Sequence, residues 1–209
     1  IIGREIPSVM AADILGAYQR LGSPPVAVRS SATAEDLPEA SFAGQQETFL
    51  NVAGAEQLLE AVRHCWASLW TARAISYRAQ RQIRADKISI AVVVQELIDA
   101  EASGIAFTAD PVTGDDTMIE INAAWGLGEA VVGGQVTPDA ITVERASRRI
   151  MRTVINTKTV MTQITDGGTT VEPVPRDRQN APTLTESQTL RLVDLAIMVE
   201  DLCKAPVDI

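Results

Sequence analysis

The sequence predicts an α+β fold of intermixed helices and strands. Apolar residues recur at helical spacing along residues 55–70, whereas residues 90–94 form a short β-branched run typical of a buried strand. Strands and helices do not alternate in regular β-α-β units, which favours α+β over α/β. A length of 209 residues with 46% apolar residues suits one domain, residues 1–209, or two lobes with a boundary near residues 85–100.

The first half of the chain carries three predicted helices. One spans residues 7–21, because Pro7 is tolerated at the first helical position and Gly22 can end the helix. Another spans residues 71–83, and we expect its arginines to form a solvated face. The third, at residues 55–70, has an apolar stripe of Leu58, Leu59, Val62, Cys65, Trp66 and Leu69. Strands are predicted at residues 26–28, 47–52 and 89–98, with a loop at 32–46.

The second half is predicted to be mainly β before a final helix. Residues 166–182 contain a Gly-Gly pair and three prolines, which indicate a turn-rich linker. Thr183 and Glu186 have the spacing of a capping box at the start of a helix that runs to about Lys204. The apolar stripe of this helix consists of Leu192, Leu195, Ala196, Val199 and Leu202. Strands are expected at residues 104–108, 118–122, 140–143 and 151–159.

Charge and composition exclude several classes of function. The net charge is −9, so the chain lacks the clustered cations of a general nucleic-acid binder. No apolar run approaches the roughly 18–20 residues that span a bilayer, and no signal-peptide pattern is present. Cys65 and Cys203 show neither metal-ligand spacing nor a disulfide framework, which favours a reducing cytoplasm. Because the chain begins at Ile1 rather than Met and stops at Ile209, we expect a piece of a longer protein.

Arg29 ends a predicted buried strand and precedes two serines. An unpaired buried charge is costly, so its guanidinium either pairs with a carboxylate or binds an anionic ligand. The planar fork of a guanidinium suits phosphate oxygens. The residues alone leave both the salt bridge and the ligand contact open.

Gly44 lies between two predicted strands in the segment from Ser41 to Thr48. Glycine lets the backbone approach a phosphate closely, and Thr48 can add a hydroxyl donor. An ordinary hairpin turn explains the same residues, so both interpretations stay open.

Gln95 and Glu96 end another predicted strand. Strand alternation puts Gln95 on the face of Val93 and Glu96 on the face of Val94. Such a polar pair is either a hinge whose backbone hydrogen-bonds a nucleobase or an ordinary strand end.

Two further polar groups lie around a glycine-rich turn. Glu129 follows Gly126 and Gly128, and glycines at this density allow close backbone approach. Glu120 and Asn122 alternate onto one face of a strand, where a carboxylate and an amide can hold Mg²⁺. A solvated or hydrogen-bonded polar face is the alternative for both groups.

Several of these segments together resemble one family. They are similar, in order, to the nucleotide-binding domain of the dikinases, which include phosphoenolpyruvate synthase, pyruvate phosphate dikinase and rifampicin phosphotransferase. The resemblance covers essentially the whole chain. It is carried by residues 26–38 (VAVRSSATAEDLP), 40–48, 65–69 (CWASL), 73–78, 93–96 (VVQE), 103–111 (SGIAFTADP) and 125–132 (WGLGEAVV).

The resemblance implies an ATP-grasp architecture, truncated here at both ends, in which two lobes hold ATP. Arg29 then matches an arginine that contacts the ATP phosphates, and Gly44 and Thr48 match the loop that closes on them. Gln95 matches the hinge residue at the adenine, and Glu129 falls in a Gly-Glu turn near the nucleotide. In the family, the β-phosphate of ATP passes to a histidine on a mobile domain, which gives AMP and phosphate, and then to pyruvate or the antibiotic on a third domain.

The sequence departs from the family pattern at three places. The N-terminal Gly-Gly-Lys segment and the phosphohistidine motif are absent, so His64 is not the phosphohistidine and we assign no catalytic residue. The metal-binding Glu of the family, with a Gln and an Arg beyond it, follows an Asp-Ile pair like Asp208 and Ile209. The resemblance therefore places the Mg²⁺ ligands beyond residue 209, and Glu120 and Asn122 are withdrawn.

We thus expect the ATP-binding part of a cytoplasmic ATP-dependent phosphotransferase, inactive on its own. Its expected partners are ATP and, within the parent chain, the phosphohistidine and acceptor domains, with no nucleic acid and no membrane. The acceptor is left open between pyruvate and rifamycin. The alternative is a non-catalytic nucleotide-binding or interaction module that kept the fold, although retention of Arg29 argues against a decayed site.

Overall fold

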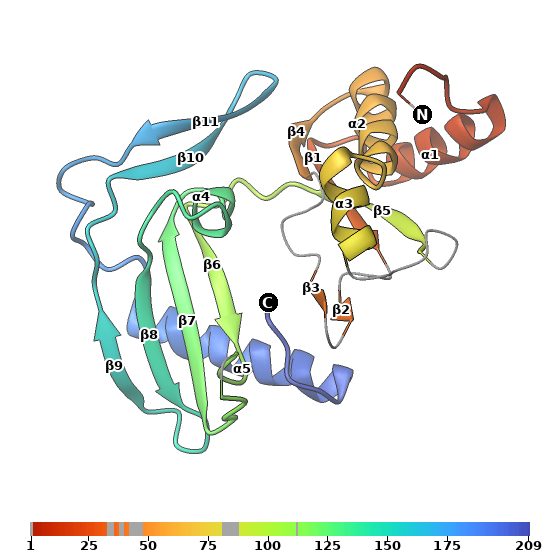
Figure 1. Ribbon diagram of the computed structural model, residues 1–209. Coiled ribbons are helices and arrows are strands. Elements are labelled where there is room, and N and C mark those ends of the chain that lie inside the picture. The colour runs from red at the N-terminus through yellow and green to blue at the C-terminus, as the bar shows by residue number, and fades with distance from the viewer. Residues whose placement is uncertain (1, 33–35, 38–39, 42–47, 81–87, 112) are drawn as a thin grey trace. The chain divides into compact units, whose positions relative to one another are not determined.

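A computed structural model describes residues 2–32, 36–37, 40–41, 48–80, 88–111 and 113–209 (Figure 1). Helices and strands are mixed along the chain, and neighbouring strands of the two larger sheets run antiparallel, which confirms the α+β class. The chain forms two compact units, residues 1–98 with 165–169, and residues 99–164 with 170–209. Among the described helices, none has the length and hydropathy needed to cross a membrane.

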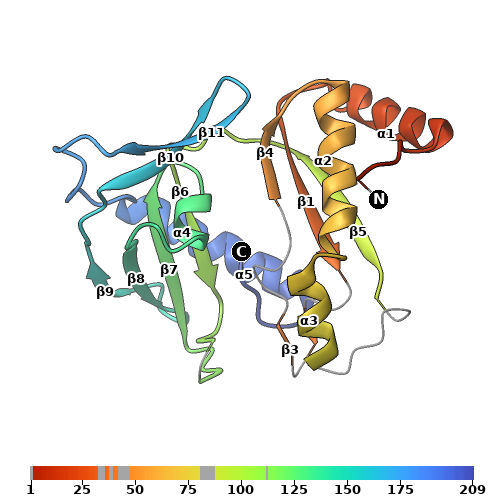
Figure 2. The same ribbon diagram turned by 45° about the horizontal axis from the view of Figure 1, so that its top comes forward.

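The first unit is built on a three-stranded sheet with a helix on one face. The helix lies along the central strand (Figure 2) and buries Leu58, Val62 and Cys65, which are at most 2% exposed, against Val26 and Val28. The helical stripe predicted around these residues is confirmed. In sheet order the elements are β4 (Thr48–Val52), β1 (Val26–Ala32) and β5 (Ile90–Glu96), with helix α2 (Ala55–Ser68).

Two further helices and a short strand pair complete the described part of this unit. The helix expected at residues 7–21 is confirmed, but the solvated arginine face is wrong for Arg78. Arg78 is only 5% exposed, donates to the carbonyl oxygen of Leu69, and stacks its guanidinium 5.4 Å from the centre of the Trp70 ring. The elements are α1 (Ser8–Arg20), α3 (Ala72–Gln80), β2 (Asp36–Leu37) and β3 (Ala40–Ser41).

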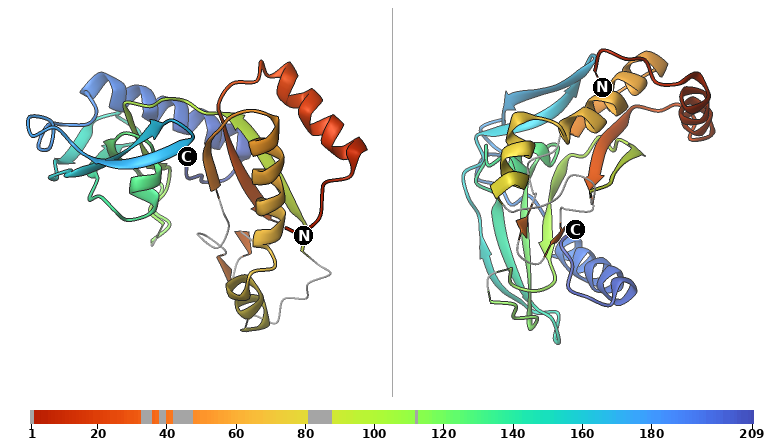
Figure 3. Two further views of the ribbon diagram at one scale, coloured as in Figure 1. Left: turned by 90° about the horizontal axis from the view of Figure 1, so that it is seen from above. Right: turned by 45° about the vertical axis from the view of Figure 1, so that its right-hand side comes forward.

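The second unit is built on a four-stranded sheet whose covered face packs on the C-terminal helix (Figure 3). Ile119, Ile121 and Val143 point from the strands toward Val193 and Ala196 of the helix, and all five are at most 2% exposed. In sheet order the strands are β6 (Ala102–Phe107), β7 (Met118–Trp125), β8 (Asp139–Glu144) and β9 (Ile150–Val154). The other elements are α4 (Glu129–Val132), β10 (Val160–Thr165), β11 (Gly168–Pro173) and α5 (Glu186–Cys203).

Helix α5 begins later than predicted and is capped by different residues. Thr185 is the N-cap: its hydroxyl accepts the Gln188 N–H at 3.3 Å, and the Gln188 side chain accepts the Thr185 N–H at 2.8 Å. The capping box predicted for Thr183 and Glu186 is therefore wrong by two residues. Thr183 has another role, because its hydroxyl donates to Asp139 Oδ2 at 2.6 Å.

The predicted apolar stripe of α5 is also largely not the face that packs on the sheet. Leu192, Leu195 and Leu202 are 37%, 44% and 77% exposed, whereas Ala196 is buried as predicted. Thr189 and Val193 form the rest of the buried face. The helix thus carries two apolar faces, and the sheet uses one of them.

Part of the predicted linker at residues 166–182 is instead a hairpin. β10 and β11 pair with each other across the two-residue turn Asp166-Gly167, where Gly167 has a φ of +82°. The tip of the hairpin, residues 165–169, groups with the first unit. There the Asn51 amide donates to the carbonyl oxygens of Thr165 at 2.6 Å and Gly168 at 3.0 Å.

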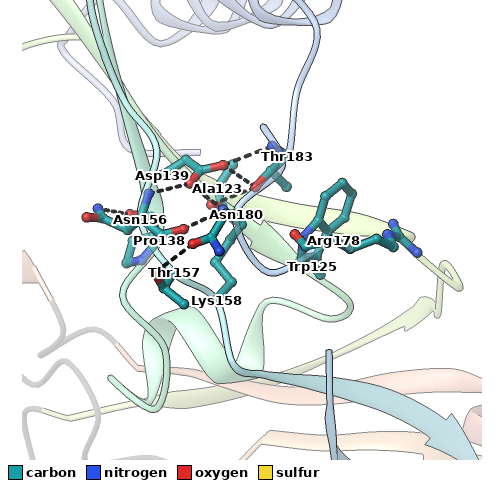
Figure 4. Close-up of polar contacts among 10 residues, drawn as sticks. All are labelled: Ala123, Trp125, Pro138, Asp139, Asn156, Thr157, Lys158, Arg178, Asn180 and Thr183. Atoms are coloured by element: carbon teal, nitrogen blue, oxygen red, sulfur yellow. Dashed lines mark hydrogen bonds and ion pairs between the residues drawn. The ribbon is translucent and has the colours of Figure 1, made fainter. Parts of the chain in front are cut away.

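The buried carboxylate of Asp139 on β8 forms an ion pair with Lys158 and also fastens the segment before α5 (Figure 4). Lys158 Nζ lies 2.5 Å from Asp139 Oδ1, and both side chains are 0% exposed. The Asp139 carboxylate also accepts N–H bonds from Asn156 and Thr183, each at 2.9 Å, and Lys158 donates to the Asn156 carbonyl oxygen at 2.8 Å. Beside this network the Arg178 guanidinium stacks 3.9 Å from the centre of the Trp125 ring. Buried charges are tolerated here because each is paired and hydrogen-bonded.

Candidate functional site

Strand register brings three of the predicted site residues onto one face of the first sheet. Arg29 on β1 lies directly opposite Thr48 on β4 and Val93 on β5, and Gln95 lies opposite Ala27. Directly opposed residues share a face of the sheet. Arg29, Thr48 and Gln95 are all exposed and lie on the face away from α2. We call the exposed residues on this side the open face of the first sheet: Arg29, Ser31, Thr48, Ala91, Val93 and Gln95.

Simple alternation of side chains produces this arrangement. Val26 and Val28 point into the core on α2, so Arg29 must point to the opposite side. In β5, Val92 and Val94 pack against the same core, and Gln95 therefore shares its face with Arg29. A spacing of two residues puts the backbone position of Gln95 about 7 Å along the strand from the position opposite Arg29.

The Arg29 side chain is an exposed cation on the open face of the first sheet. Among the described residues, no carboxylate lies within ion-pair distance of its guanidinium, so the salt-bridge interpretation finds no partner there. The fork geometry of a guanidinium favours phosphate or carboxylate as its ligand. Thr48, directly opposite, adds a hydroxyl that can donate to the same anion.

Gly44 lies outside the described residues, and its predicted role stays a prediction. Glu129 is the first residue of α4 in the second unit and is exposed. The preceding turn is held firmly: the Leu127 N–H donates to the Thr162 carbonyl oxygen at 2.8 Å, and the Ser103 hydroxyl donates to that of Gly126 at 2.5 Å.

Glycine is required at position 126 of this turn. Its φ is +78°, and a Cβ there would lie 2.3 Å from the Thr162 carbonyl oxygen. The close approach predicted from the glycines is thus made to a neighbouring strand of the protein.

Glu120 and Asn122 share one face of β7, as strand alternation predicted, and it is the face away from α5. They line a cavity of about 240 Å³ together with Thr142 and Arg152. Arg152 was missed by the sequence reasoning, because it reaches this cavity through the pairing of β9 with β8, where it lies opposite Thr142. Among the described residues, no group of three or more His, Cys, Asp or Glu side chains is arranged to hold a metal ion. These residues therefore do not by themselves fit a Mg²⁺ site.

His64 is partly exposed, and its surroundings are those of a surface helix. Its Nε2 lies 3.9 Å from the Glu60 carboxylate one turn earlier, and its ring meets Phe49 edge-on at 5.9 Å between centres. Cys65, next to it, is fully buried in the core, as its place in the helical stripe predicted.

An exposed arginine, a threonine and a glutamine on one face of a sheet have the chemistry to contact an anionic, hydrogen-bonding ligand. Comparison with known proteins gives the family. The chain belongs to the pyruvate phosphate dikinase, AMP/ATP-binding domain family, whose model matches residues 1–209.

Curated relatives show the same relationship. The chain is 44% identical over 214 residues to a probable phosphoenolpyruvate synthase of Methanothermobacter thermautotrophicus, covering 100% of this chain and 31% of the relative. It is 46% identical over 205 residues to a rifampicin phosphotransferase of Streptomyces, covering 98% and 24%. It is 46% identical over 218 residues to a phosphoenolpyruvate synthase of Pyrococcus furiosus, covering 98% and 27%. The chain thus spans about a quarter to a third of the length of these relatives.

Proposed function

We propose that this chain is the ATP-binding part of a dikinase-type phosphotransferase with an ATP-grasp architecture. The parent enzyme passes the β-phosphate of ATP to a histidine on a separate domain, which gives AMP and phosphate, and then to pyruvate or rifamycin. The observation that carries the proposal is the shared open face of Arg29, Thr48 and Gln95 in a chain of the AMP/ATP-binding family. A cytoplasmic location is part of the proposal and is supported by the sequence, whose two cysteines show no disulfide framework.

Each side chain has a role that follows from its chemistry. Phosphoryl transfer needs charge neutralisation and positioning more than covalent help from the protein. The Arg29 fork neutralises and orients phosphate oxygens, and the Thr48 hydroxyl donates to them. Gln95 provides donor and acceptor groups for the adenine edge. Glu129 and Gly44 complete the proposed set, and Mg²⁺, when bound, supplies further charge neutralisation.

Calorimetric titration with ATP, with and without Mg²⁺, tests the proposal. Arg29→Ala should weaken binding by about 1.5–3 kcal/mol, the scale of a lost hydrogen bond to a charged group. Arg20→Ala removes an exposed arginine from α1 and serves as the matched control, with no expected change. The same pair is measured in the longer parent protein, since its flanking residues belong to the proposed site.

An unchanged affinity of Arg29→Ala in the parent would remove the phosphate role. Binding that is lost with Arg29→Ala, in a parent with no ATP-dependent phosphorylation of a histidine, would favour a non-catalytic nucleotide-binding module. Glu129→Gln in the same titration tests the contribution of that carboxylate.

A further inference from the structure

Strand β4 contains one residue more than the stretch of β1 that pairs with it. Val52 lies opposite Val26 and Phe49 lies opposite Val28, so three steps along β4 match two steps along β1. An extra residue of this kind is a β-bulge, and a shift of one residue exchanges the two faces of the strand beyond it. The bulge therefore decides which face of the sheet each residue of β4 before Leu50 occupies.

The packing of β4 shows the effect of the bulge. Phe49 and Val52 both pack on the core that α2 covers, although residues three apart in a regular strand lie on opposite faces. Thr48 consequently lies on the open face of the first sheet, directly opposite Arg29. In a regular strand Arg29 would instead lie opposite Phe49, and Thr48 would point into the core.

Asn51 holds the backbone at this bulge. Its φ is +56°, a left-handed conformation that asparagine adopts more readily than most residues with a side chain. It is only 9% exposed, and its amide nitrogen donates to the carbonyl oxygens of Thr165 at 2.6 Å and Gly168 at 3.0 Å. One side chain thus fastens β4 to both ends of the β10–β11 hairpin turn.

We propose that Asn51 is a positioning residue for the phosphate contact, because it holds the bulge of β4 and so keeps Thr48 on the open face beside Arg29. This role rests on the proposed function, in which Arg29 and Thr48 contact the phosphates of ATP. An aliphatic side chain at position 51 could not donate to the two carbonyl groups, and a β-branched one would also be strained at this φ. A hairpin tip that lies 114 residues from Asn51 in the sequence thereby supports the nucleotide site.

The affinity for ATP in the longer parent protein, measured by calorimetry, separates positioning from a purely structural role. Thr48→Val removes the hydroxyl with little change of shape and should weaken ATP binding about tenfold, as for one lost hydrogen bond to a charged group. Asn51→Ala should weaken binding about three- to tenfold, because Thr48 is no longer held in place. The double variant should bind ATP no more weakly than Thr48→Val does, since Asn51 acts through Thr48.

Two further variants serve as controls. Thr185→Ala also removes a side-chain hydrogen bond to the backbone, but in the second unit, and should leave the affinity for ATP unchanged. Asn51→Gly loses the same two hydrogen bonds as Asn51→Ala, and glycine adopts a positive φ without strain. It should show the same coupling to Thr48→Val, and it replaces the alanine variant if that variant does not fold.

Each outcome decides the role of Asn51. Wild-type affinity in a folded Asn51 variant, beside weakened binding in Thr48→Val, would overturn the positioning role and leave the proposed function intact. Additive losses in the double variant would also overturn it, because Asn51 would then act on binding by another route. An equal loss of affinity in Thr185→Ala would do the same, since the cause would be a general loss of stability. If neither Arg29→Ala nor Thr48→Val weakened ATP binding, the proposed function would fail, and the role of Asn51 with it.

Discussion

The two units use the same architecture, a helix on an antiparallel sheet, but hold it together differently. In the first unit α2 buries most of its predicted stripe, with Leu58, Val62 and Cys65 in the core against the sheet, while Leu59 and Trp66 are half-buried. In the second unit α5 packs through a smaller face that includes Thr189 and leaves Leu195 exposed. The segment leading to α5 is fastened by Thr183, which donates to Asp139, and Asp139 forms a buried ion pair with Lys158. No salt bridge among the first unit's described residues is fully buried.

The difference shows that an apolar stripe alone does not identify the face of a helix that packs on a sheet. Helix α2, which packs on both the sheet and α1, buries its most apolar side. In α5 the richer apolar side, with Leu192, Leu195 and Leu202, is not the side that packs on the sheet. The four predictions below test this contrast.

The largest change in the free energy of unfolding is expected at the buried ion pair of the second unit. Lys158→Met should lower the free energy of unfolding by about 3–5 kcal/mol, because it leaves the Asp139 carboxylate buried without its cation. Urea unfolding measures the loss, and hydrogen exchange should locate it in β8 while β1 keeps its rates. The double variant Asp139→Asn with Lys158→Met should recover part of the stability. A single-variant loss below about 1 kcal/mol would contradict the role given to the pair.

In the first unit the largest effect should come from the apolar core. Leu58→Ala should cost about 2–5 kcal/mol, because Leu58 is 0% exposed and its removal leaves a cavity. Leu195→Ala, the matched control on α5, should cost less than about 1 kcal/mol in this chain, since it is 44% exposed. Comparable losses of stability in the two variants would contradict the difference in burial between α2 and α5.

A smaller loss of stability is expected from removing the N-cap of α5. Thr185→Ala should destabilise α5 by about 1 kcal/mol, because the capping box is lost. Thr185→Ser keeps the hydroxyl and should stay close to the wild type in thermal unfolding. The N-cap of α2 is Gly54, which provides no side-chain cap, so that helix depends on packing alone. Loss of stability in the serine variant equal to that in the alanine variant would exclude capping as the cause.

The smallest effect is expected on the open face of the first sheet. Gln95→Ala should weaken ATP binding by about 0.5–1.5 kcal/mol, the net value of a neutral hydrogen bond. It should leave tripolyphosphate binding unchanged, because that ligand lacks the base. Titration calorimetry with both ligands distinguishes the two, and equal losses would remove Gln95 from the adenine contact.

Much of the fold could be predicted because local patterns and tertiary packing agree along most of the chain. The helix of Leu58 and the strand of Val92 and Val94 follow directly from their spacing. The hairpin of β10 and β11 was missed because glycines and prolines around it indicate turns. Its signal was nevertheless present, since Asp166-Gly167 is a typical two-residue hairpin turn. The start of α5 was misplaced because Thr183 and Thr185 are both possible caps, and only the contact of Thr183 with Asp139 separates them.

For the candidate site, alternation alone was enough to place Gln95 on the same face as Val93. That Arg29 and Thr48 lie directly opposite each other depends on the pairing of β1 with β4, which local patterns do not encode. Arg78 could not be predicted as buried, since its partners, the Leu69 carbonyl and the Trp70 ring, are set by the turn between two helices.

The path of the chain between the units has a consequence for recombination between relatives. Neither unit is one continuous stretch, because the hairpin tip at residues 165–169 groups with residues 1–98. A gene crossover after codon 98 would leave Asn51, whose amide holds the carbonyls of Thr165 and Gly168, with a hairpin tip inherited from another parent. Viable chimaeras should therefore inherit both pieces from the same parent, or carry tips whose backbone follows the same path.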